Sequence, residues 1–174
     1  SVTVGIAQDL DSLDPHKAVN AGTGEVLFNV FEGLMKASPD GGVIPAVASD
    51  YKISPDGTTY TFTLREGVKF HNGKEVTMKD VVYSLERCAG SENDGTPLVA
   101  AFSNVADISS DDQGRVVITL TEPSLEFLNS MTAAIGAQRV LSASAIRSSV
   151  VKLNANQTAR GCGYGLEFSC AQRQ

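Results

Sequence analysis

The amino-acid sequence predicts an α/β fold of the α+β type, with mixed and largely antiparallel sheets. Tyr60, Phe62 and Leu64 alternate with threonines, which is the pattern of a strand with one buried face. The segments 50–65 and 105–120 each hold two strand-like stretches around a glycine-containing turn, as β-hairpins do. Helix-like segments interleave with these strands without a regular βαβ rhythm, so the sheets are expected to be mixed.

The first part of the chain predicts a strand and then a helix. Residues 2–6 alternate apolar with small or polar residues and lead into a turn-rich stretch around Pro15. Residues 22–36 are predicted to be helical, with Thr23 as the N-cap. Their apolar residues recur at helical spacing on one face: Val26, Leu27, Val30, Phe31 and Leu34.

The middle of the chain predicts a second helix and a second hairpin. The helix is expected to begin at Thr77, because Asp80 stands three residues later, as in a capping box. Strands are predicted over residues 105–109 and 115–120. Pro123 is expected to open a short third helix, since proline is favoured at the first helical position.

Composition and charge limit the possible functions. The 174 residues carry a net charge of −6, which argues against nucleic-acid binding. No apolar stretch approaches the ~20 residues that a membrane span needs. The charge is uneven, because residues 136–174 carry +4 and the rest of the chain carries −10. Such a change of sign within one small chain indicates two segments of different origin.

Residues that could carry chemistry are few and scattered. His16 and His71 lie in turn-like stretches without a second ligand nearby, and Cys162 and Cys170 are too far apart for a CxxC site. No metal or other cofactor is therefore expected. The aspartates of residues 9–14 are expected to cap turns rather than to catalyse a reaction. Catalytic patterns such as GxSxG, the Walker loop and HExxH are absent, so an enzyme is not expected.

Residues 58–87 carry the most specific pattern in the chain. They read TTYTFTLREGVKFHNGKEVTMKDVVYSLER. This stretch closely resembles the signature of the solute-binding family that includes the oligopeptide-, dipeptide- and nickel-binding receptors of ABC transporters. The stretches 12–16, 29–34 and 45–48 resemble further motifs of the same family, and they follow in the same order.

The resemblance implies the N-terminal part of a longer, two-lobed periplasmic-binding-protein fold that closes on its ligand. Residues 1–45 would begin the first lobe, and residues 46–135 would form its hairpin-rich subdomain. The implied partners are a peptide or other small solute and the permease subunits of an ABC transporter. The protein would be periplasmic or extracellular, with membrane association only through the transporter or a lost lipid anchor. A stand-alone ligand-sensing or interaction domain without a transport role is the alternative.

The loop before the first predicted helix is the candidate ligand-binding site. Carried over residue by residue, Val19, Asn20 and Ala21 match positions that line the cleft of peptide-binding relatives. Gly22 and Thr23 complete the site, because small residues let a ligand backbone approach and free amides at a helix N-terminus favour a carboxylate. Val19 offers no charged clasp for a peptide amine. An ordinary connecting loop is the alternative interpretation.

Leu98 is the second candidate ligand contact. In the peptide-binding relatives an aromatic residue follows the matching proline and meets the ligand. Leu98 after Pro97 would therefore give the site a smaller and less polar wall. The signature at 58–87 is itself expected to be scaffold, because its residues have local structural roles in strand, turn and helix start.

Residues 136–174 do not continue the family pattern. Asn154-Ala155-Asn156 resembles the approach to a glycine-rich motif of the relatives, and the sequence departs from that motif at Gln157. Together with the change of charge, this departure leads to the hypothesis that the tail is an out-of-frame or artificially added stretch. A genuine lineage-specific ending is the alternative.

Overall fold

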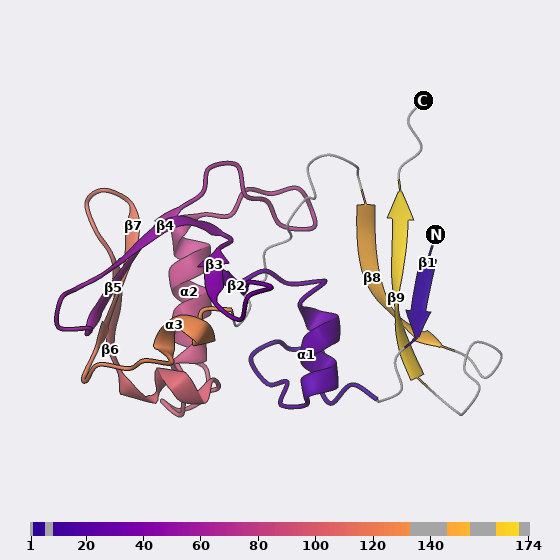
Figure 1. Cartoon of the computed structure of the whole chain (residues 1–174), viewed down its shortest axis with the longest axis horizontal. Coiled ribbons are helices and arrows are strands. Elements are labelled where there is room, and N and C mark those ends of the chain that lie inside the picture. Colours follow the sequence, from indigo (N-terminus) through magenta and orange to yellow (C-terminus); the bar gives the residue numbers. More distant parts are fainter. Residues whose placement is uncertain (1, 6–8, 133–145, 154–162, 171–174) are drawn as a thin grey trace. The chain divides into compact units, whose positions relative to one another are not determined.

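The computed structural model describes residues 2–5, 9–132, 146–153 and 163–170, with side chains over 9–132. The chain divides into two compact units (Figure 1). The first unit comprises Ser1–Phe31 and Arg139–Gln174, and the second comprises Glu32–Gln138.

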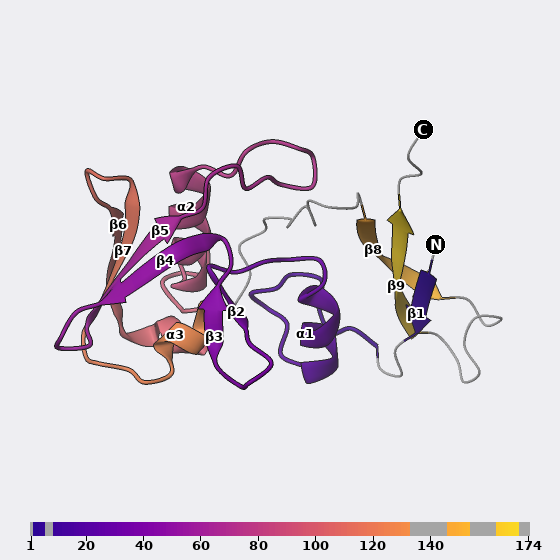
Figure 2. The ribbon, with the colours of Figure 1, turned by 45° about the horizontal axis from the view of Figure 1, so that its top comes forward.

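Among its described residues, the first unit contains a three-stranded antiparallel sheet and one short helix. Its strands are β1 (Val2–Gly5), β8 (Ile146–Leu153) and β9 (Gly163–Cys170), and its helix is α1 (Ala21–Leu27). The sheet order is β1-β9-β8, so β9 lies between the other two (Figures 1 and 2). The predicted strand over residues 2–6 is confirmed. The tail contributes two strands, while the stretch 154–156 lies outside the described residues.

The predicted helix over residues 22–36 is wrong beyond its first two turns. Helix α1 ends at Leu27, and Phe28, which follows it, is exposed. Further on, the chain turns into strand β2 (Met35–Ala37), and the Met35 amide donates to the Met131 carbonyl oxygen at 3.1 Å. The apolar residues of this stretch are spaced as in a helix. Leu34 and Met35 are nevertheless buried outside a helix, where their backbone groups pair with segments farther along the chain. Tertiary contacts therefore override the local helical pattern.

The second unit is built on a four-stranded antiparallel sheet of order β4-β5-β7-β6 (Figure 1). Its strands are β4 (Ala48–Ile53), β5 (Thr59–Leu64), β6 (Val105–Ser110) and β7 (Arg115–Leu120). Both predicted hairpins are thereby confirmed. A separate antiparallel pair joins β2 to β3 (Val43–Pro45).

The register of the sheet places the apolar residues on one face. Tyr60 stands opposite Ile118, and Phe62 stands opposite Val116. All four side chains are buried, whereas the intervening threonines of β5 are not. The alternation of apolar residues and threonines in the sequence therefore indicates a sheet with one face packed against the core.

Helix α2 (Met78–Cys88) covers this apolar face, since it packs against β6 and β7. Its residues Val81, Leu85 and Cys88 are buried in the core. These residues lie three or four positions apart, so one face of the helix meets the core.

A short helix closes the core at one end. Helix α3 (Phe127–Ser130) packs against β2 and against the 3₁₀ helix η1 (Ala100–Asn104). The Phe127 ring meets Tyr60 edge-on, with ring centroids 5.0 Å apart. The helix begins after Pro123, at Phe127, so the sequence located this element but placed its start too early.

The start of α2 has the capping box that the sequence predicts. The Thr77 hydroxyl oxygen accepts a hydrogen bond from the Asp80 amide at 3.3 Å, and the Asp80 carboxylate accepts one from the Thr77 amide at 2.8 Å. Two amides of the first turn, which have no partner within the helix, are thereby satisfied.

Replacing Thr77 with alanine is expected to lower the free energy of unfolding by about 1 kcal/mol, because the hydroxyl cap is lost. Urea denaturation of the variant and the wild type measures this difference. Lys79→Ala is the matched control, since Lys79 lies exposed in the same turn. Equal losses in both variants would contradict the assigned role of the cap.

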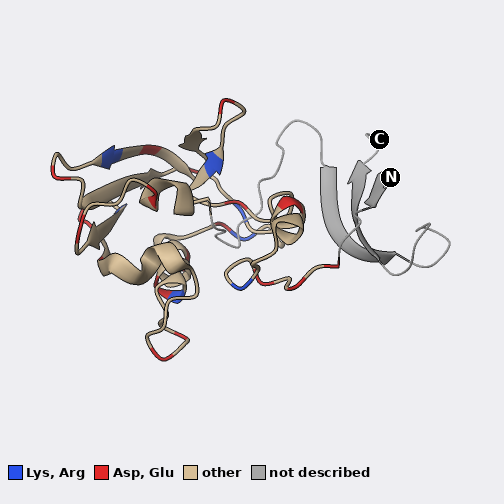
Figure 3. Cartoon of the chain, turned by 60° about the horizontal axis from the view of Figure 1, so that its bottom comes forward, with Lys and Arg blue, Asp and Glu red and all other residues tan. Residues whose placement is uncertain are grey.

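The surface of the described part is mixed in charge. Lys and Arg are interspersed with Asp and Glu along the strands, turns and helices that Figure 3 colours. Within the described residues, no helix is both long enough and apolar enough to cross a membrane.

Candidate ligand-binding site

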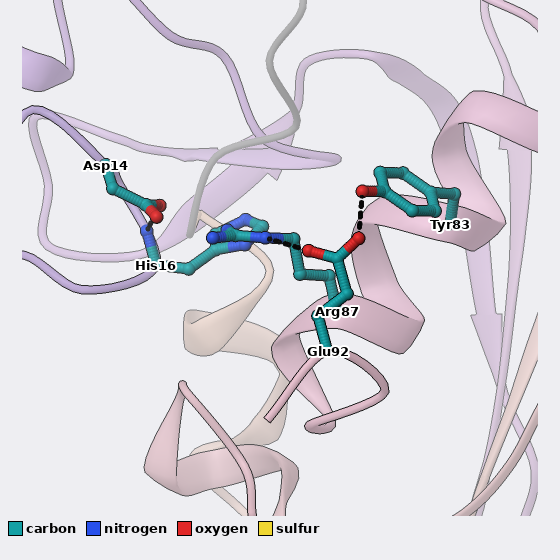
Figure 4. A network of polar contacts seen from close by, with 5 residues as sticks. All are labelled: Asp14, His16, Tyr83, Arg87 and Glu92. Carbon is teal, nitrogen blue, oxygen red and sulfur yellow. Dashed lines mark hydrogen bonds and ion pairs between the residues drawn. The ribbon is translucent and has the colours of Figure 1, made fainter. Parts of the chain in front are cut away.

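The loop that leads into α1 begins with a turn built on Asp14. The Asp14 carbonyl oxygen accepts hydrogen bonds from the amides of Lys17 and Ala18, each at 3.0 Å. Its carboxylate accepts one from the His16 amide at 3.1 Å, as Figure 4 shows. Asp14 therefore acts as a turn-capping residue, in agreement with the sequence interpretation.

Asp11 fixes the rest of this loop. One carboxylate oxygen of Asp11 accepts hydrogen bonds from the amides of Val19 at 2.7 Å and Asn20 at 3.2 Å. The other accepts one from the Thr23 hydroxyl, whose oxygen in turn accepts one from the Asp11 amide. A single carboxylate thus ties the start of α1 to the turn-rich stretch before it.

These contacts change the acidity of Asp11. Its pKa falls from the ordinary 3.8 to about 2, chiefly because the Thr23 hydroxyl, and next the Val19 amide, stabilise the ionised carboxylate. Partial desolvation acts in the opposite direction and is outweighed. The ionised form of Asp11 is therefore the form that holds the loop.

The loop is expected to loosen in acid. The pKa of Asp11 is lower in the folded chain, so its stabilising contribution is present above about pH 4 and is lost as the pH falls toward 2. Hydrogen exchange at the Val19 and Asn20 amides should accelerate over this window, relative to their intrinsic rates. In Asp11→Asn these amides should be less protected at neutral pH and should show a flatter pH dependence.

Asp9→Asn is the matched control, because Asp9 is exposed two residues away and no carboxylate hydrogen bond is described for it. Its amide-exchange profile at Val19 and Asn20 should follow that of the wild type. An unchanged profile in Asp11→Asn would show that the Asp11 carboxylate does not hold the loop.

The structure places the predicted ligand-binding residues in unequal environments. Val19 is 86% exposed, Asn20 and Ala21 are exposed, and Gly22 is half-buried. Thr23 is buried, with its hydroxyl bonded to Asp11. The four residues 19–22 therefore form an accessible strip, whereas Thr23 supports it from inside.

One part of the sequence interpretation of this loop is corrected, and one contact is added to it. The N-cap of α1 is Asn20 and not Thr23, because Thr23 lies inside the helix. The amides of Val19 and Asn20 are not free for a ligand carboxylate, since the Asp11 carboxylate already accepts from both. The Asp11 carboxylate therefore engages two amides beside the start of α1.

Leu98, the other predicted contact, lies in the second unit. It is half-buried, and its amide donates to the carbonyl oxygen of Cys88, the last residue of α2, at 3.0 Å. Leu98 therefore ends a loop that returns to the C-terminus of α2.

The sequence interpretation missed a polar network on this loop. The Tyr83 hydroxyl donates to one carboxylate oxygen of Glu92, and Arg87 Nε donates to the other at 3.1 Å (Figure 4). Tyr83 and Arg87 stand four residues apart and so share one face of α2. The four-residue spacing of Tyr83 and Arg87 can be seen in the sequence. Glu92, however, lies in a polar stretch for which the sequence predicts only a loop.

The part of the chain that the structure describes contains no cluster of metal-binding side chains. No group of three or more His, Cys, Asp or Glu side chains there could hold a metal ion. His71 is exposed in a turn in which the Gly73 amide donates to the Phe70 carbonyl oxygen. Cys88 is a buried thiol that is not part of a disulfide, and Cys162 lies outside the described residues.

The hairpin subdomain and its covering helix match one protein family. Residues 42–155 fit the sequence pattern of the family described as "Bacterial extracellular solute-binding proteins, family 5 Middle". The chain belongs to this family. The matched stretch contains Leu98 and the signature at 58–87, and the 19–23 loop precedes it.

Named relatives agree with the assignment to this family. It is 32% identical over 128 residues to a glutathione-binding protein, GsiB, of Salmonella typhi. This alignment covers 74% of the chain and 25% of the relative, so the chain spans about a quarter of the curated relatives that it matches.

Solved structures show the same fold. The binding protein AgaA from A. tumefaciens R10, in complex with agropinic acid, superposes with a TM-score of 0.64 at 29% identity, over 74% of this chain and 26% of AgaA. The murein tripeptide-binding protein MppA, in its unliganded open form, gives a TM-score of 0.65 at 26% identity, over 87% of this chain and 37% of MppA. The predicted membership of the peptide- and nickel-type family and the predicted fold class are confirmed.

Proposed function

We propose that the chain is the N-terminal part of the substrate-binding component of an ABC importer. It would capture a peptide or a related small solute and deliver it to the permease subunits in the membrane. The match of residues 42–155 to the solute-binding family carries this proposal. The named relatives support the solute class, since their names or titles give glutathione, agropinic acid and a murein tripeptide.

The proposed activity is binding without chemical conversion. The named relatives are binding proteins rather than enzymes. The family description places its members outside the cell membrane, and we propose a periplasmic or cell-surface location. Attachment would come from the transporter or from a lipid anchor.

Within this proposal, Val19, Asn20, Ala21 and Gly22 contribute one accessible part of the solute site, and Leu98 contributes an apolar contact. Val19 carries no charge, and Asp11 already engages the amides of Val19 and Asn20. The loop would therefore meet the solute through van der Waals contact and the remaining polar groups. A charged clasp for a peptide terminus would have to come from elsewhere in the protein.

Isothermal titration calorimetry on the full-length protein tests the proposal. The titrants are glutathione, tri-alanine, a dipeptide and agropinic acid, and we expect saturable binding of at least one of them. Leu98→Ala should weaken that binding, whereas Ile44→Ala, which alters an exposed apolar residue outside the proposed site, should not. Absence of binding across the whole panel would contradict the proposed solute class.

A further inference from the structure

The loop 91–98 folds back over the end of α2. The amides of Gly90 and Ser91 donate to the carbonyl oxygens of Arg87 and Glu86, which is the pattern of a helix ending in a Schellman motif. Gly90 has φ +101°, and a Cβ built there would lie 2.5 Å from the backbone carbon and oxygen of Thr96. The returning chain therefore crosses directly over Gly90, in a space that only glycine leaves open.

Both ends of this loop are tied to α2 through the backbone. The amides of Leu98 and Val99 donate to the same carbonyl oxygen, that of Cys88, at 3.0 and 3.2 Å. Within the loop, the Asn93 side-chain amide donates to the Thr96 carbonyl oxygen at 3.0 Å. These bonds set the path of the loop at its base.

The tip of the loop is held by side chains. Glu92 uses one carboxylate oxygen for the Tyr83 hydroxyl and the other for Arg87 Nε, so one loop residue bridges two residues of α2 (Figure 4). The Arg87 side chain is 19% exposed and that of Glu92 is 48% exposed, so the bridge lies at the edge of solvent. The acceptor is charged, and hydrogen bonds to charged groups are stronger than neutral ones.

We propose that Tyr83, Arg87 and Glu92 are positioning residues that fix the 91–98 loop against α2 and so set the place of Leu98 for the solute. This inference rests on the proposed function, in which Leu98 touches the solute. A loop that is already ordered needs no ordering when the solute binds, and the fraction of molecules ready to bind is higher. Releasing the tip would therefore weaken solute binding without opening the core.

Tyr83→Phe tests the inference most directly, because it removes one hydroxyl and keeps the ring. In the full-length protein, each of glutathione, tri-alanine, the dipeptide and agropinic acid that the wild type binds should bind about three- to tenfold more weakly, as expected for loss of a partly exposed hydrogen bond to a charged group. Amide exchange over residues 91–96 should accelerate, while the thermal midpoint stays close to that of the wild type. Tyr51→Phe is the matched control, since the Tyr51 ring stacks on Phe62 and no hydroxyl bond is described for it.

The outcomes separate the inference from the proposed function. If the wild type binds none of glutathione, tri-alanine, the dipeptide and agropinic acid, the proposed function fails and the positioning role fails with it. If the wild type binds and Tyr83→Phe binds equally well, the positioning role is overturned and the proposed function stands. Weaker binding without faster exchange in the loop also overturns the positioning role. Should Tyr83→Phe unfold, Glu92→Gln, which keeps the shape of the side chain, is measured in its place with the same criteria.

Discussion

Alanine in place of Phe127 is expected to lower the free energy of unfolding of the second unit by about 3–5 kcal/mol, the range for deleting a buried aromatic ring. Phe127 is fully buried. Its ring packs against Tyr60 at a centroid distance of 5.0 Å and against Phe102 at 5.4 Å. Because α3 has only four residues, its attachment to the core depends on this ring more than on its own backbone bonds.

Urea denaturation followed by tyrosine fluorescence measures this loss. The chain has four tyrosines and no tryptophan, and Tyr51, Tyr60 and Tyr83 all lie in the second unit. Leu125→Ala is the matched control, because Leu125 is 102% exposed and stands two residues before Phe127. A loss of about 0.5 kcal/mol or less in Phe127→Ala, the range of ordinary surface substitutions, would contradict the packing of this ring in the core.

Gly33→Ala is expected to destabilise the second unit by about 3 kcal/mol, at the upper end of overpacking effects. A Cβ at Gly33 would lie 2.9 Å from the backbone carbon and oxygen of Thr132, and it would also collide with the Met131 carbonyl oxygen. These are backbone atoms, which cannot move aside as a flexible side chain would. The Met131 oxygen also accepts from the Met35 amide, so a shift there disturbs the start of β2.

Gly24→Ala is the control for this substitution. Gly24 lies inside α1, and a Cβ built there would meet no atom within 4 Å. Alanine favours a helix over glycine by up to about 1 kcal/mol, so this variant should be neutral or slightly more stable than the wild type. Similar losses of stability in both variants would contradict the role given to the close approach of the 131–132 backbone to Gly33.

The stretch Glu32-Gly33-Leu34 shows why the first helix was predicted too long. In sequence, Leu34 continues the helical spacing of Val26 and Leu27. In the structure the glycine lets the chain at 131–132 cross at close range, and Leu34 is buried in the second unit. A crossing between segments about a hundred residues apart leaves no trace in local periodicity, so the sequence alone could not show it.

The hairpins and the start of α2 were predictable because their signals are local. Turn residues separate β4 from β5 and β6 from β7, and the alternation in β5 fixes which face is buried. Thr77 and Asp80 stand three residues apart, so their mutual capping can be read from the sequence. Elements whose partners are near in sequence are the ones that a pattern can locate.

The candidate site was only partly predictable. The capping role of the early aspartates follows from residue type, but the partners of Asp11 lie 8 to 12 residues later in the chain. Local patterns therefore could not show that the fold pairs the Val19 and Asn20 amides with this carboxylate. The contribution of residues 19–22 and Leu98 to solute binding, and the origin of residues 136–174, remain predictions.

The order of strands in the first unit has a consequence for how the chain folds during synthesis. The residues of the second unit are continuous, so this unit can form as soon as its stretch has left the ribosome. The first sheet cannot, because β9 lies between β1 and β8 and is the last of the three to be made. Strand β1 therefore keeps an open edge through most of translation, and such an edge favours pairing with other chains until β9 covers it.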